Sequence, residues 1–227
     1  MAAQVEASDG QVLNVGRYAD VRGGMRDADV VMFRGDGLCS KVCAIGGGGI
    51  YSHAGLVFWE KERVRLVQAT GKNGVWVCNL SDELREYHGA IELWRVESKF
   101  DRPPFDPRGA IGEANRCIGA RYAYSTLWSF FWDWLFHPVF RRSFRSRAQS
   151  RKAFFCSQLV AHSYRVGGKL DLDPHHGDAA TGPGDLPRGG RISRLCAFAH
   201  DDVVDPLPDA CRTVASCPTS ARAPVPG

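Results

Sequence analysis

Two residues of this 227-residue chain have the types and the local context that thiol chemistry requires. Cys156 lies in the segment FFCSQLV, whose apolar spacing predicts a helix that begins near the cysteine. The partial positive charge at the start of a helix lowers the pKa of a thiol and favours the nucleophilic thiolate. His53 lies in YSHAG, at the expected start of a strand that would hold its imidazole rigidly. We therefore expect Cys156 to be a nucleophile and His53 its base.

Each of these residues also has a structural interpretation. A free cysteine is usually a small buried hydrophobe, and a single histidine on a strand is more often part of the packing. The glycines at 46–49 favour a flexible hinge rather than a phosphate-binding loop, because no Lys-Ser/Thr pair follows them. Residue type and position alone do not decide between packing and catalysis.

The elements that must position this pair begin with strands. Short apolar or alternating runs separated by turn residues predict strands, and three consecutive runs of this kind predict an antiparallel meander. The expected strands are 29–33, then the meander 52–58, 64–69 and 75–80, and a further strand at 90–96.

Helices are expected mainly in the second half of the chain. Asp106 before Pro107 is an N-cap signal for a helix that runs to about residue 118. The helix that begins at Cys156 should end near Val166, before Gly167-Gly168. Shorter helices are expected after Ser40 and over 81–87. Strands followed by helices indicate the α+β class.

The chain divides into three parts by composition. Residues 1–25 predict a loosely held lead-in, with a helix near Tyr18, and 26–199 predict one catalytic domain. Residues 200–227 are proline-rich and without periodicity, which predicts a disordered tail.

Within the domain, residues 127–152 form an aromatic and basic insertion. The stretch 127–136 holds six aromatic side chains, and a run of cations follows it. Such a pattern is typical of an interfacial helix beside a phosphate-attracting patch, so contact with a membrane surface or an acyl chain is one interpretation. Packing in the core or in a cleft wall is the other.

The bulk composition limits the compartment and the partners. A net charge of +4 is too small to indicate nucleic-acid binding. The start of the chain lacks a basic and apolar leader, and no apolar run reaches the length of a spanning helix, so a cytoplasmic location is the expectation. Export by a route without a signal peptide is the alternative. The eight cysteines are expected to be reduced thiols.

The order of these motifs resembles a known superfamily. YSHAG followed much later by FFCSQLV is similar to the circularly permuted papain-like proteins of the YaeF/YiiX group, relatives of NlpC/P60 peptidases and of lecithin:retinol acyltransferase. The resemblance covers about residues 29–168. It implies a permuted papain-like fold, in which an antiparallel sheet or partial barrel packs against helices and the catalytic cysteine starts a helix.

The resemblance also implies further site residues. Gln68 stands where these proteins often carry an acid that orients the imidazole, and its amide accepts a hydrogen bond but carries no charge. Asp36 and Asp82 are alternative orienting groups. The candidate substrate-binding residues are Tyr51, Tyr122, Tyr124 and Ser157. Ordinary aromatic packing is an equal interpretation for Tyr122 and Tyr124.

The function implied by the resemblance is amide hydrolysis through a Cys156 acyl-enzyme, on a peptide, an isopeptide or a peptidoglycan peptide. An acyltransferase or lipid hydrolase acting on an acyl-lipid is the alternative enzyme, and a non-catalytic lipid- or membrane-binding module is the alternative of another class. A cell-wall substrate together with the absence of a leader suggests a secreted effector or toxin with a neutralising immunity-type partner.

No cofactor and no metal are expected from the sequence. His175 and His176 lie near Asp171, Asp173 and Asp178, but no spacing matches a zinc signature. Cys39 and Cys43 lack a downstream partner pair.

Overall fold

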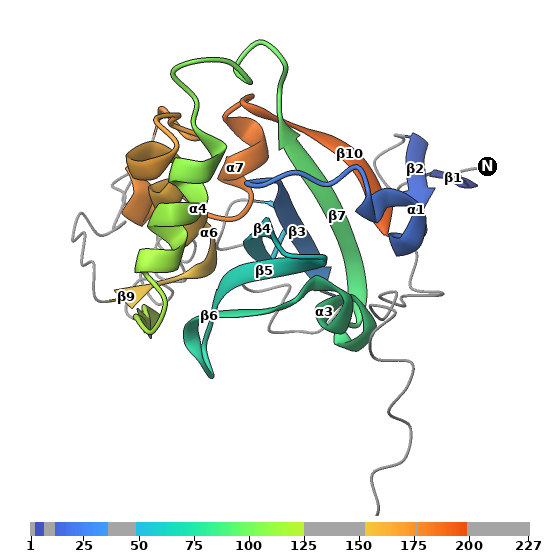
Figure 1. Ribbon diagram of the computed structural model, residues 1–227, viewed down its shortest axis with the longest axis horizontal. Coiled ribbons are helices and arrows are strands. Elements are labelled where there is room, and N and C mark those ends of the chain that lie inside the picture. The colour runs from blue at the N-terminus through green and yellow to red at the C-terminus, as the bar shows by residue number, and fades with distance from the viewer. Residues whose placement is uncertain (1–2, 7–11, 36–48, 125–152, 176, 199–227) are drawn as a thin grey trace, which may run out of the picture.

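The structure, a computed structural model, describes residues 3–6, 12–35, 49–124, 153–175 and 177–198 (Figure 1). The strands are β1 (Ala3–Glu6), β2 (Val12–Gly16), β3 (Val30–Gly35), β4 (His53–Glu60), β5 (Arg63–Thr70), β6 (Gly74–Asn79), β7 (Gly89–Val96), β8 (Arg121–Tyr122), β9 (Ala153–Phe154) and β10 (Ile192–Phe198). The helices are α1 (Tyr18–Arg22), α3 (Leu80–Glu86), α4 (Pro107–Arg116), α6 (Cys156–His162), the π-helical turn η1 (Ser163–Gly167), the 3₁₀ turn η2 (Asp178–Ala180) and α7 (Asp185–Arg188). The expected α+β class is confirmed.

Eight of the strands in the described residues form one sheet, in the order β1-β2-β10-β7-β3-β4-β5-β6. The expected meander is confirmed, because β4 pairs antiparallel with β5 and β5 with β6. β3 lies between β7 and β4 and sets Phe33 opposite His53. The sheet is mixed rather than antiparallel throughout, since β10 pairs parallel with β2.

Within the first 25 residues, the described segments 3–6 and 12–25 include two strands and a helix. β1 and β2 pair with each other, and β2 joins the main sheet through β10. The helix expected near Tyr18 is present as α1, and the Tyr18 side chain is fully buried. β10 was not expected from the sequence. It lies between β2 and β7, and both of these strands are far from it along the chain. A pairing between distant strands cannot be predicted from a local sequence pattern.

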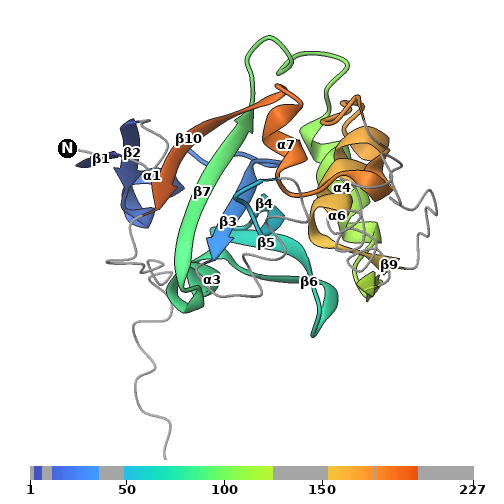
Figure 2. The ribbon, with the colours of Figure 1, turned by 180° about the vertical axis from the view of Figure 1, so that it is seen from behind.

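Two hydrophobic clusters cover the two faces of the sheet. The first joins sheet residues such as Met32 and Val67 to Ala110 of α4 and Leu159 of α6. The second packs the other face against α1 and α3, and includes Tyr18 and Leu84. Figures 1 and 2 show α4, α6 and α7 together on one side of the molecule and α1 on the opposite side. The alternation of apolar residues along each strand builds both clusters.

The helix signals read from the sequence match the structure closely. The Asp106 carboxylate accepts a hydrogen bond from the Gly109 backbone N–H at 3.0 Å, as an N-cap does. The helix expected from Cys156 is α6, continued by η1 as far as Gly167. The helix expected after Ser40, the insertion 127–152 and the tail 200–227 all lie outside the described residues.

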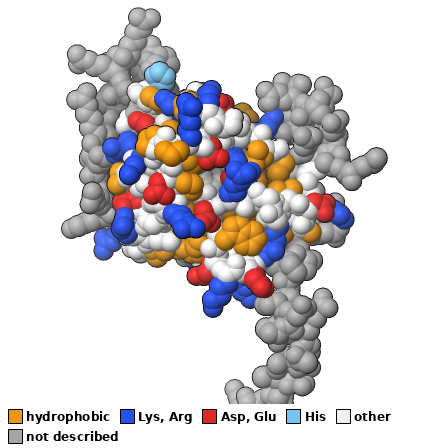
Figure 3. Space-filling model, turned by 45° about the horizontal axis from the view of Figure 1, so that its top comes forward, with side chains coloured by type: hydrophobic (Ala, Val, Ile, Leu, Met, Phe, Trp, Pro, Cys, Tyr) orange, Lys and Arg blue, Asp and Glu red, His pale blue; other side chains and the backbone are white. Residues whose placement is uncertain are grey.

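Three further features concern the surface charge, the helix lengths and the thiols of the described part of the chain. Basic and acidic side chains are interspersed on the face shown in Figure 3. None of the described helices is long and apolar enough to cross a membrane. The cysteines at 78, 117, 156 and 196 are free thiols, as expected.

Asp29, at the entry to β3, should contribute strongly to stability. Its buried carboxylate accepts two hydrogen bonds from the Arg95 guanidinium, at 2.8 and 2.7 Å, and one from the Arg26 backbone N–H. Removing one partner of a buried ion pair leaves the other uncompensated, so Asp29→Ala should lower the free energy of unfolding by about 3 kcal/mol. Urea denaturation measures this. Asp20→Ala, which removes only a surface pair with Arg17, should leave stability nearly unchanged, and equal losses in the two variants would contradict the prediction.

Candidate active site

The structure brings Cys156 and His53 together although 102 intervening positions separate them in the sequence. α6 packs on β4, so the first residue of the helix faces the first residue of the strand. Their side chains are hydrogen-bonded to each other. Cys156 is only 3% exposed and packs with Phe155 and Ala123, whereas His53 is half-buried. The candidate nucleophile and its candidate base therefore interact directly.

The surroundings of Cys156 favour the thiolate. Burial alone raises the pKa of the thiol, but the charge of His53, its hydrogen bond, and the backbone N–H groups of Ala54 and Ser157 outweigh burial and lower this pKa below its ordinary value. Other thiols differ. Burial raises the pKa of Cys78 to about 12 and that of Cys196 to about 11. Of these three thiols, Cys156 is the one set up to be a nucleophile at neutral pH.

The side chain that holds the His53 ring is Gln68. Its Oε1 lies 2.6 Å from His53 Nε2, and the residue is fully buried. Gly55 stands directly opposite Gln68 in the β4–β5 pairing. A Cβ at Gly55 would lie 3.3 Å from the Gln68 Cβ and 2.8 Å from a Leu66 methyl group. The glycine therefore leaves the space through which the Gln68 amide reaches the imidazole.

Glu83 fixes the direction of the Gln68 amide. The Nε2 of Gln68 lies 2.8 Å from Glu83 Oε2, and a carboxylate of this kind accepts hydrogen bonds. The amide nitrogen must then face Glu83, and the amide oxygen must face His53. An amide oxygen only accepts, so His53 Nε2 carries the proton in this contact. Nδ1 is the ring nitrogen left to take the Cys156 proton.

Together these contacts favour the protonated form of His53. Burial lowers the pKa of His53, but the Cys156 thiolate, the two side-chain hydrogen bonds and the Glu83 charge outweigh burial and raise this pKa. A lowered thiol pKa beside a raised imidazole pKa is the signature of a thiolate–imidazolium pair. Cys156, His53, Gln68 and Glu83 form one hydrogen-bonded chain.

Glu83 was missed in the sequence analysis, which named the neighbouring Asp82. In the structure Asp82 accepts hydrogen bonds from Asn79 and Arg85, and neither contact leads to His53. Adjacent positions on a helix point about 100° apart, so a one-residue difference in α3 decides which acid reaches Gln68. An acid in the helix after β6 was the available signal, and the sequence did not separate the two. Asp36 lies outside the described residues.

Two of the candidate substrate-binding residues make internal contacts instead. The Tyr51 hydroxyl donates to the buried Glu92 carboxylate at 2.7 Å, and its ring packs edge-on against Trp94. The Ser157 hydroxyl is fully buried and donates to the Thr181 carbonyl at 2.8 Å. These contacts tie both hydroxyls to the scaffold, and the substrate-binding role of Tyr51 and Ser157 stays a prediction.

Tyr122 and Tyr124 lie next to each other, with ring centroids 5.0 Å apart in an edge-on arrangement. Tyr122 packs against the small cluster that contains Cys156. Tyr124 is 55% exposed, and its hydroxyl donates to the Gly71 carbonyl at 2.8 Å. Of the two, Tyr122 is therefore the one positioned to meet a group bound at the thiol.

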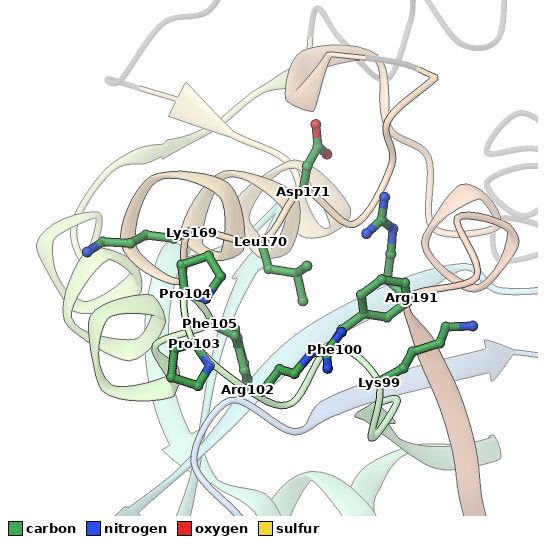
Figure 4. Close-up of a pocket in the computed structure, with 10 residues that line it drawn as sticks. All are labelled: Lys99, Phe100, Arg102, Pro103, Pro104, Phe105, Lys169, Leu170, Asp171 and Arg191. Atoms are coloured by element: carbon green, nitrogen blue, oxygen red, sulfur yellow. The ribbon is translucent and has the colours of Figure 1, made fainter.

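A separate pocket of about 540 Å³ lies between the segment before α4, the residues after η1 and the start of β10 (Figure 4). Figure 4 shows Leu170 in the middle of the lining residues, with the Lys169 and Lys99 amines directed outward to opposite sides. None of the residues in the Cys156–Glu83 chain lines this pocket. The pocket is therefore not the approach to the thiol.

Comparison with known proteins gives a fold and no activity. No family model matches the chain, and no curated protein matches it. The structure is similar to the crystal structure of the metalloprotein YiiX from Escherichia coli O157:H7, with a TM-score of 0.54, 13% identity, and coverage of 75% of this chain and 96% of YiiX. The likeness concerns the fold alone. Function must be argued from the site residues.

Proposed function

We propose that this protein is a cysteine hydrolase with a permuted papain-like fold, in which Cys156 is the nucleophile and His53 the general base and acid. The observation that carries the proposal is the hydrogen-bonded chain from Cys156 through His53 and Gln68 to Glu83. The fold likeness to YiiX supports the fold part of the proposal. The resemblance of YSHAG and FFCSQLV to the same group is independent support from the sequence.

The first half of the reaction forms an acyl-enzyme. The Cys156 thiolate attacks the carbonyl carbon of an amide, and a C–S bond forms as the carbonyl oxygen gains negative charge. The Cys156 backbone N–H at the start of α6 is our candidate donor for that oxygen. The C–N bond then breaks, and the His53 imidazolium gives its Nδ1 proton to the departing amine.

The second half releases the acid. His53, now neutral, takes a proton from a water molecule, and the resulting hydroxide attacks the thioester carbon. The C–S bond breaks, and the thiolate and imidazolium return to their starting states. Amine leaving groups need protonation as they depart, and an imidazolium beside the thiolate supplies that proton. For this reason an amide substrate suits the pair.

The test is to trap the acyl-enzyme. The full chain is incubated with labelled peptide amides, muropeptides and phospholipid vesicles, quenched in acid, and analysed by intact-mass and peptide-mapping mass spectrometry. We expect a thioester on the Cys156 peptide with an amide substrate. Cys156→Ala should form none, and Cys196→Ala, which removes another buried thiol, should react like the native chain.

Two results bear against the proposal. Turnover that survives in Cys156→Ala would remove the nucleophile from the mechanism. A thioester formed only with phospholipid would keep the nucleophile and replace amide hydrolysis with lipid acyl chemistry, because both reactions share the same acyl-enzyme.

A further inference from the structure

A second group of chemically active side chains lies at the opposite end of α6 from Cys156. It consists of Glu113 on α4, Cys117 just after α4, and His162 at the end of α6. One ligand atom from each lies within 4.8 Å of the other two, and all three residues are buried. A carboxylate, a thiol and an imidazole that converge inside a protein form a ligand set of the kind that zinc binds.

Close packing of α4 on η1 brings these residues together. A Cβ built on Gly167 would lie 2.1 Å from the Gly109 carbonyl oxygen and 2.8 Å from the Glu113 Cβ. A side chain at either position would therefore clash, and the two backbones come this close only because both residues are glycine. The two backbones can therefore approach far enough for Glu113 to face His162.

Both nitrogens of the His162 ring face a carboxylate. Nδ1 lies 3.4 Å from Asp178 Oδ2, and Nε2 lies 3.2 Å from Glu113 Oε1. Asp178 is itself held by two hydrogen bonds from Arg165, at 2.6 and 2.7 Å. A neutral imidazole donates from only one nitrogen, so the second contact requires a cation between the ring and the carboxylate, either a proton or a metal ion.

We infer that Glu113, Cys117 and His162 bind one divalent metal ion of the zinc class, and that Asp178 orients His162 for it. With Nδ1–H donating to Asp178, the Nε2 lone pair points toward Glu113 and Cys117, which is the carboxylate–histidine–metal arrangement. One thiolate and one carboxylate offset the double positive charge of the ion. Tetrahedral zinc keeps its ligand atoms about 3.3–3.7 Å apart. His162 Nε2 and Glu113 Oε1, 3.2 Å apart, already have nearly this spacing, so binding moves the Cys117 thiol inward by at most about 1 Å.

The ion would join α4 to the helix that begins with Cys156, and would stabilise the packing of these two elements. Three protein ligands leave the fourth tetrahedral position to a water molecule. None of the three ligands belongs to the Cys156–Glu83 chain. A failure of metal binding would therefore leave the proposed hydrolase function untouched, and a failure of the hydrolase function would leave the metal site untouched.

The test is metal titration of the full chain in a Cys156→Ala background, which removes the other thiolate beside an imidazole. After chelator treatment, Zn²⁺ is titrated by calorimetry and Co²⁺ by near-ultraviolet absorption, where a cobalt–thiolate bond gives a charge-transfer band. We expect one equivalent of Zn²⁺, a higher melting temperature with Zn²⁺, and a cobalt–thiolate band. Adding Cys117→Ala should abolish the band, and Asp178→Asn should weaken Zn²⁺ binding by about 10- to 100-fold.

Matched variants separate this site from other thiols. Cys196→Ala removes a buried thiol outside the group and should leave the band and the affinity unchanged. Absence of Zn²⁺ binding would overturn the inference and leave an ion-pair cluster. A Zn²⁺ affinity in Cys117→Ala or His162→Gln equal to that of the parent Cys156→Ala chain would have the same meaning. If Cys117→Ala does not fold, the nearly isosteric Glu113→Gln takes its place, and an unchanged affinity there has the same meaning.

Discussion

Replacing His53 by alanine should slow the alkylation of Cys156 by iodoacetamide about 30-fold at pH 6.5. In the native chain His53 lowers the pKa of Cys156 against the opposing effect of burial. Without His53, burial remains and raises this pKa. A thiol with the ordinary pKa of about 8.5 is only about 1% thiolate at pH 6.5. A native thiolate that is fully formed at pH 6.5 would exceed this fraction about 100-fold. The lower intrinsic nucleophilicity of a low-pKa thiolate reduces the difference in alkylation rate to about 30-fold.

The pH profile gives the sign of the effect. In the native chain the lowered pKa of Cys156 shifts the rise in alkylation rate to lower pH than for an ordinary thiol. In His53→Ala the rate should still be rising steeply between pH 7 and 9, because the thiolate forms only there. Peptide mapping assigns each rate to its cysteine, and Cys156→Ala identifies the background. Superimposable profiles for the native chain and His53→Ala would mean that the two side chains do not form an ion pair.

Removing the Gln68 amide should have the second largest effect. In Gln68→Leu, which keeps a buried side chain of similar size, the His53 ring loses its Nε2 partner and with it the fixed tautomer. We expect Cys156 alkylation at pH 6.5 to fall by about 10-fold and the apparent pKa of Cys156 to rise, by analogy with the partners that orient metal-bound imidazoles, which are worth about 10- to 100-fold. Circular dichroism and urea denaturation establish that the fold is retained.

Variants of Glu83 separate orientation from charge. Glu83→Gln keeps an acceptor for the Gln68 amide but removes the charge, whereas Glu83→Leu removes both. If orientation of the amide matters most, Glu83→Leu slows alkylation and Glu83→Gln changes it little. If charge dominates, the two variants are slowed alike. Asp82→Asn, in the same helix but outside the chain of contacts, is the matched control, and a loss there equal to that in Glu83→Leu would contradict the assignment of Glu83.

The double exchange Gln68→Glu with Glu83→Gln is a gain-of-function counterpart. It moves the carboxylate from the far side of the amide to direct contact with His53. A carboxylate stabilises an imidazolium more strongly than an amide oxygen does. The apparent pKa of His53, followed by NMR, should therefore rise, and Gln68→Glu alone should not match it, because two carboxylates in contact share a proton.

Several features of this protein were determined by the sequence itself. The meander from β4 to β6, the Asp106 cap of α4 and the start of α6 at Cys156 all follow from residues within a few positions of one another. Strand alternation, capping side chains and helix spacing are local properties, so short segments encode them. The resemblance of the two motifs predicts His53, Cys156 and Gln68 as site residues, and in the structure His53 interacts with both of the others.

Only the tertiary structure decided the contacts between distant segments. Three features depend on which faces pack together. These are the insertion of β10 between β2 and β7, the contact of Gln68 with Glu83 rather than Asp82, and the internal contacts of Tyr51 and Ser157. The group of Glu113, Cys117 and His162 also depends on packing, because its members come from α4, the residue after α4, and α6. The sequence contains no zinc-signature spacing that marks these residues. Packing of one element on another sets where each side chain points, and a linear pattern does not contain that information.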